Sequence, residues 1–110
     1  MKKILLSLAL SALLCSCSAS YDYADEIISV YEEAVDDFAD AESLGELQQM
    51  RNDMNAKCEQ LKEEEKESRQ ELIQAIEQFD EDAYLIKLEI LTAESHALWM
   101  YHVKEHELKK

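Results

Sequence analysis

The sequence predicts an all-α protein: a small antiparallel three-helix bundle, or a helical hairpin with an additional helix, after an N-terminal leader. The 110 residues contain no Pro and a single Gly, Gly45, so few turns of a β-sheet are signalled. Apolar residues recur at steps of three and four, which is the period of an α-helix. The roughly ninety residues after the leader are enough for one domain with a modest core.

The first helix is expected from about residue 22 to residue 42. A single apolar stripe runs along it, formed by Ala24, Ile27, Ile28, Tyr31, Ala34, Val35 and Phe38. The rest of this segment is acidic, without Lys or Arg from Asp22 to Glu46. A solvated face is the simpler interpretation, because a hard-cation site needs converging oxygens. A docking face for a basic protein and a loose divalent-cation surface are the alternatives.

The second helix is expected from about residue 46 to residue 79. It follows a corner at Gly45, where Ser43 and Glu46 have the spacing of a capping box. Its seam keeps a seven-residue rhythm at Leu47, Met54, Cys58, Leu61, Leu72, Ala75 and Phe79. The charged block 62–71 interrupts this seam, and Ser68 is again placed to cap a helix. A break near Ser68 is therefore the alternative to one long helix.

The third helix is expected from about residue 83 to residue 108, after an N-cap signal at residues 80–82. It is apolar on two sides. One stripe consists of Tyr84, Leu88, Leu91, Leu98 and His102, and the other of Ile86, Ile90, Ala93 and Ala97. A helix that is apolar on most sides is usually buried by several neighbours. We therefore expect it at the centre of the bundle, with any remaining area covered by a partner chain.

The densest bulky cluster in the chain is Leu98, Trp99, Met100 and Tyr101. Four consecutive residues of a helix cannot all face one neighbour. Because Trp, Tyr and Met are enriched at interaction hot spots, we predict a contact patch here. Burial between three helices is the alternative.

The segment from His102 to His106 matches the pattern H-x-x-E-H, the inverted zinc-protease motif. On a helix, His102 and His106 lie one above the other, and Glu105 could assist them in holding zinc or copper. Only four residues follow the motif, so the acid that would complete a peptidase site is missing. We expect no enzyme and no cofactor, with a weak divalent-metal site as the alternative to a pair of exposed histidines.

The first seventeen residues have the layout of a secretory signal peptide. Lys2 and Lys3 give a positive start, and the apolar run 4–15 is too short to span a bilayer. The stretch Leu14-Cys15-Ser16-Cys17 resembles the lipobox of bacterial lipoproteins of the Bacteroidota type. An ordinary signal peptide cut near Ala19, which would leave a secreted protein, is the alternative.

This resemblance implies a division of the chain into three parts: a signal peptide at 1–16, a lipidated tether at 17–21 and a helical domain at 22–110. Cys17 would carry the fatty chains, including palmitate, and two or more chains anchor stably to a membrane. The resemblance implies the cell envelope, and the outer membrane is favoured over the inner one because Ser18 rather than Asp follows Cys17.

The charge of the chain excludes two classes of partner. The formal net charge is −14, and without Lys2 and Lys3 the chain from Cys17 onward has 9 basic and 25 acidic residues, or −16. Nucleic acid and anionic lipid surfaces would repel such a chain, whereas a basic envelope protein would attract it. After lipidation Cys58 has no partner for an internal disulfide, so we expect a small buried side chain. A Cys58–Cys58 link in a homo-oligomer is the alternative.

A short helical lipoprotein ending in Lys110 also resembles the peptidoglycan-linked murein lipoprotein, whose last lysine is joined to the cell wall. The present sequence lacks the sustained heptads of that coiled-coil rod. We therefore expect an acidic cell-envelope lipoprotein that acts through protein contacts. A metal- or ligand-binding lipoprotein and a peptidoglycan-linked tether are the alternatives.

Overall fold

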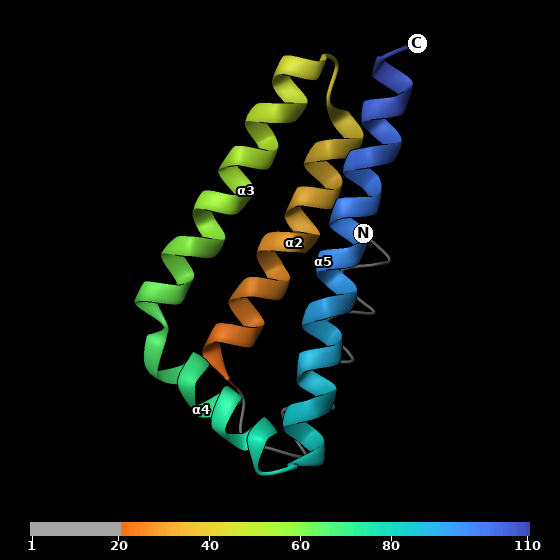
Figure 1. The fold of residues 1–110 in the computed structure, drawn as a ribbon. Helices are drawn as coiled ribbons and strands as arrows, with labels where there is room; N and C mark the ends of the chain where they lie inside the picture. The colour runs from red at the N-terminus through yellow and green to blue at the C-terminus, as the bar shows by residue number, and fades with distance from the viewer. Residues whose placement is uncertain (1–20) are drawn as a thin grey trace.

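Three helical rods lie side by side in a computed structural model that describes residues 21–110 (Figure 1). This part of the chain forms four helices and no strand, which confirms the predicted all-α fold. Their bounds are α2 (Asp22–Asp40), α3 (Leu44–Glu64), α4 (Lys66–Glu77) and α5 (Glu81–Leu108). The molecule measures 47 × 30 × 20 Å, so it is flattened, with α2 between α3 and α5 in Figure 1.

The central element is α2, because its apolar stripe is wide enough to meet a helix on each side. Seven of its residues are buried: Tyr23, Ala24, Ile27, Tyr31, Ala34, Val35 and Phe38. Phe38, Ile27 and Leu47 of α3 are the largest fully buried side chains. The prediction that the third helix is central was wrong. α5 packs one of its two apolar stripes on α2 and leaves the other uncovered.

The predicted corner after the first helix is confirmed. α2 ends at Asp40, and Ser43 is the N-cap of α3, with its Oγ accepting a hydrogen bond from the backbone N–H of Glu46 at 3.1 Å. The cap satisfies one of the donors that a helix start leaves unpaired. α3 then runs antiparallel to α2, and the predicted seam residues Leu47, Met54, Cys58 and Leu61 are buried.

The prediction of one long helix from 46 to 79 was wrong, because Glu65 leaves the helical conformation at φ −109° and ψ 34°. No buried side chain lies between Leu61 and Leu72, so packing does not hold that stretch straight. The break lies three residues before Ser68, and Ser68 does not cap α4. Its Oγ instead accepts from the backbone N–H of Tyr23 at 3.1 Å, which caps the first turn of α2.

The turn into α5 confirms the predicted N-cap and corrects one seam residue. Asp80 accepts from the backbone N–H of Ala83 at 3.1 Å, as the acidic run 80–82 predicted. Phe79, which was expected in the seam, is 91% exposed. It occupies the left-handed region at φ 61°, between the end of α4 and the start of α5.

The predicted leader, the lipid site Cys17 and most of the tether lie outside the described residues. From residue 21 onward, none of the helices combines the length and the apolar character needed to cross a bilayer. The four helices described lie within the predicted helical domain 22–110.

Candidate functional site

The structure divides the predicted contact patch between the core and the surface. Tyr101 is only 4% exposed: its ring lies 5.4 Å from that of Phe38, edge to face, and 4.7 Å from the Arg51 guanidinium. Met100 is half-buried against the core. Trp99 is 60% exposed, and Leu98 is half-buried beside it. Tyr101 is therefore removed from the contact patch, and Trp99 remains as its most exposed member.

Trp99 belongs to a longer surface along α5, here called the outer face. Its members are spaced by three and four residues and are exposed or half-exposed: Tyr84, Leu85, Leu88, Leu91, Thr92, Ser95, Leu98, Trp99, His102 and Val103. None of them is Asp, Glu, Lys or Arg. The face extends over about 28 Å of helix. On a chain with a formal charge of −14, this is a long uncharged surface.

Five large apolar side chains give the outer face its character. Their exposed fractions range from 42% at Leu88 to 60% at Trp99, with Tyr84, Leu85 and Leu91 between these values. Contiguous exposed apolar patches of this kind mark contact sites in soluble proteins. The core of the monomer does not use these side chains, because the buried residues of α5 are Ala83, Ile86, Ala97 and Tyr101 on the opposite side.

The polar residues Thr92 and Ser95 of the outer face can be buried under another molecule at little cost in free energy. Thr92 donates its hydroxyl hydrogen to the backbone carbonyl of Leu88 at 2.8 Å. A covering surface therefore leaves no unsatisfied Thr92 donor, which would otherwise cost about 1–3 kcal/mol. Ser95, the small side chain near the middle of the face, allows another backbone to approach closely.

The two ends of the outer face carry opposite charges. Asp80 and Glu81 lie at its N-terminal end, where the helix dipole favours acids. His106, Lys109 and Lys110 lie at its C-terminal end. Lys109 Nζ is 3.8 Å from Glu105 Oε2 within the same helix. An uncharged surface thus runs along α5, with acids at its N-terminal end and, at its C-terminal end, the bases His106, Lys109 and Lys110 beside Glu105 and Glu107.

The three predicted metal ligands lie at this C-terminal end. His102 and His106 are exposed, and His102 Nδ1 lies 3.6 Å from Glu105 Oε1. Among residues 21–110, no three His, Cys, Asp or Glu side chains are arranged to hold a metal ion. The weak metal site stays a prediction, and the histidines are otherwise part of the outer face and its edge.

The acidic residues of α2 border an open groove against α3. The groove has a volume of about 290 Å³, a floor that includes Ala34 and Met54, and a rim that includes Glu33, Asp37 and Lys57. A neighbouring hollow of about 260 Å³ shares Lys57 and continues toward α4. These carboxylates form a rim and do not converge on a point. Docking of a basic protein on this ridge stays a prediction.

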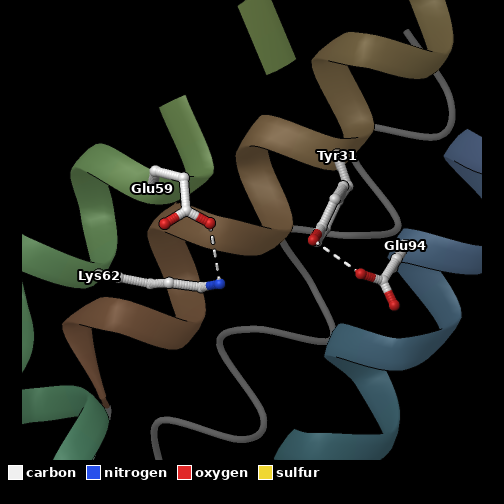
Figure 2. A network of polar contacts seen from close by, with 4 residues as sticks. All are labelled: Tyr31, Glu59, Lys62 and Glu94. Atoms are coloured by element: carbon white, nitrogen blue, oxygen red, sulfur yellow. Dashed lines mark hydrogen bonds and ion pairs between the residues drawn. The ribbon is translucent and has the colours of Figure 1, made fainter. Parts of the chain in front are cut away.

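A polar cluster joins the three rods inside the bundle. Tyr31 of α2 donates its phenol hydrogen to Glu94 Oε2 of α5 at 3.0 Å (Figure 2). Burial, and then the hydrogen bond with Cys58, raise the pKa of Tyr31 well above its ordinary value. Burial likewise raises the pKa of the Cys58 thiol. Cys58 is a free, buried side chain, as predicted, and both groups are kept neutral as part of the core.

Phe79 is the residue that sequence reasoning misplaced. Two hydrogen bonds close the end of α4: Asp80 N–H donates to the carbonyl of Ala75, and Phe79 N–H to that of Ile76, both at 3.0 Å. This is a Schellman motif, in which the left-handed position is usually Gly. A bulky residue there is strained, and its ring is exposed at the start of α5. The three acids that follow Phe79 were the only available signal that a turn begins there.

Comparisons with protein-family models, with curated proteins and with solved structures yield no match to this chain.

Proposed function

We propose that this protein is a membrane-anchored lipoprotein of the cell envelope that works as a protein-contact module through the outer face of α5. The observation that carries the proposal is the uncharged outer face, which runs along a strongly acidic chain and which the fold leaves uncovered. Exposed Trp and Tyr side chains in such a patch are typical of interaction hot spots. The lipobox-like stretch before Cys17 supports the anchor, and two or more acyl chains would make it stable.

The test has two parts, both made in envelopes of cells that express the full chain. The Cys17→Ala variant should move from the membrane fraction to the soluble fraction, because the lipid site is lost. Continued residence in the membrane would contradict the anchor. This part is independent of what covers α5.

The second part places a photo-reactive residue at Leu91 on the outer face, and as a control at Gln48, an exposed position on α3. We expect a discrete cross-linked product from Leu91 and none from Gln48. Adding Trp99→Ala should reduce the product, because truncating a hot spot weakens binding. If Leu91 yields no product, the contact function is wrong.

A further inference from the structure

We infer that a second copy of this chain covers the outer face of α5, with the two α5 helices packed antiparallel about a twofold axis. The inference rests on the contact function proposed above and identifies the partner. A twofold interface must be self-complementary, because each surface meets its own copy in the opposite direction. The outer face meets this requirement in its charges and in its side-chain sizes.

Charge complementarity selects the antiparallel arrangement. Acids lie at the start of the outer face and bases at its end. When two copies run in opposite directions, Glu81 of one copy lies beside Lys109 of the other, and the reciprocal pair forms at the other end. A parallel pair would bring Glu81 beside Glu81 and Lys109 beside Lys109. Antiparallel α5 helices also place opposite ends of their dipoles together.

The order of side-chain sizes sets the register. If Ser95 lies on the twofold axis, each Trp99 packs on Leu91 of the other copy, and each Leu88 lies opposite His102. The smallest side chain is then at the crossing point, where two helices approach to about 8–10 Å. The large side chains flank that point on both sides. The same register produces the Glu81–Lys109 pairs without further adjustment.

The strong net charge of the chain does not prevent this pairing. The acidic ridge of α2 and the rims of its groove lie on other sides of the bundle than the outer face. They are separated from the second copy by the thickness of α5, about 10–12 Å. This exceeds the screening length of about 8 Å at physiological ionic strength, so repulsion between these acids is largely screened.

The pairing also fits two copies anchored in one membrane. α2 starts at the same end of the bundle as α5, so an antiparallel pair places the two α2 starts at opposite ends (Figure 1). If the twofold axis is perpendicular to the membrane, both bundles lie along its surface and both tethers start at the same height. Both copies could then be anchored in the same membrane.

Engineered cysteines in the full chain test the inference. The background is Cys58→Ala, which removes the one cysteine in residues 21–110. In this background, Ser95→Cys should form a linked dimer on mild oxidation, because two residues on the twofold axis come within disulfide reach. The matched variant Leu88→Cys should not, because its two copies lie about 21 Å apart along the helices. The background chain alone should also remain unlinked.

The double variant Leu88→Cys/His102→Cys is a second test of whether the two α5 helices run antiparallel. Antiparallel pairing brings these two positions together across the interface, so this double variant should be linked although neither single variant is. A parallel pair would instead link Leu88→Cys alone as readily as Ser95→Cys, and that result would overturn the inference.

Charge reversal tests the two ends of the interface. Glu81→Lys and Lys109→Glu should each lower the yield of the Ser95→Cys link several-fold, because each places like charges together. The combination of both reversals in one chain should restore it. Failure to restore the link would contradict the Glu81–Lys109 pairing.

The experiments distinguish a failure of the second-copy inference from a failure of the proposed contact function. If Leu91 cross-links to a different protein while Ser95→Cys gives no dimer, the contact function stands and the second copy is wrong. If neither experiment yields a product, both are wrong. A Ser95→Cys dimer together with a Leu91 product of twice the mass of the chain supports both.

Discussion

The inner and outer faces of α5 have similar amounts of apolar side chain but opposite environments. On the inner face, Ala97 and Tyr101 are at most 4% exposed and pack on α2. On the outer face of the same helix, Leu88 is 42% exposed and Trp99, which lies between Ala97 and Tyr101 in the sequence, is 60% exposed. The packing of residues 21–110 therefore accounts for the inner face of α5 and leaves the outer face exposed.

The register between α2 and α5 shows why only one face is used. Tyr31 contacts Glu94, and Phe38 contacts Tyr101, so the two helices run in the same direction with a constant offset of 63 residues. α3 packs mainly on α2 and also contacts α5, where the Arg51 guanidinium lies over the Tyr101 ring. Because α2, α3 and α4 all pack on the inner side of α5, no helix among residues 21–110 covers the outer face.

Truncation of matched residues gives the largest difference between the two faces. Ile86→Ala on the inner face should lower the free energy of unfolding by about 2–4 kcal/mol, because it leaves a cavity in the core. Leu88→Ala, two residues away on the outer face, should cost less than about 1 kcal/mol in the monomer, because Leu88 is already 42% exposed. Urea unfolding at low protein concentration measures both values. Equal losses would show that the outer face is part of the core.

The tyrosine hydroxyls provide a second, smaller comparison. Tyr31→Phe should lower the free energy of unfolding by about 1.5 kcal/mol, because the hydroxyl donates to a carboxylate across the bundle. Tyr84→Phe, on the outer face, should have almost no effect. Urea unfolding of the two variants side by side distinguishes these outcomes.

Tyr31 should also make the stability depend on alkaline pH. Its pKa is higher in the folded than in the unfolded chain, so folding retains a proton that unfolding releases. Its contribution is complete below the unfolded pKa of about 10 and is lost as the pH rises above that value. Tyr31→Phe should therefore reduce the loss of stability at alkaline pH, and an unchanged pH profile would contradict this role.

The smallest expected effect is a gain in stability at the turn that precedes α5. Phe79→Gly should raise the free energy of unfolding by about 0.5–1 kcal/mol, because Gly adopts a φ of 61° without strain. The exposed ring contributes little packing that could be lost, since it is 91% exposed. Thermal unfolding of this variant measures the gain. A decrease in stability would show that the Phe79 ring contributes to packing, as the buried residues of α5 do.

Local signals predicted where α3 and α5 begin. Ser43 and Asp80 have the sequence pattern of N-caps, and both accept the expected backbone hydrogen bond. Capping is a matter of residues three positions apart, so it can be read from the sequence alone. The stripe from Ile27 to Phe38 was likewise visible, because its period follows from helix geometry.

Long-range contacts were not predictable in the same way. Ser68 has the spacing of a cap for its own helix, yet its hydroxyl accepts from Tyr23, 45 residues earlier in the chain. Similarly, the seven-residue rhythm placed Phe79 in the seam, whereas the end of α4 turns it to solvent. For Ser68 the decisive neighbour comes from a distant part of the sequence, whereas Phe79 is placed by the local hydrogen bonds that end α4.

The sequence by itself determined that the chain is helical, that helices begin after Ser43 and Asp80, and that the third predicted helix is apolar on two sides, because helix period and capping depend only on near neighbours. Only the tertiary structure decided which of these two sides is the core. That choice depends on how α2, α3 and α4 pack on α5, with α2 making the largest contact. It leaves Trp99 and its neighbours along α5 exposed, because these three helices all pack on the opposite side of α5.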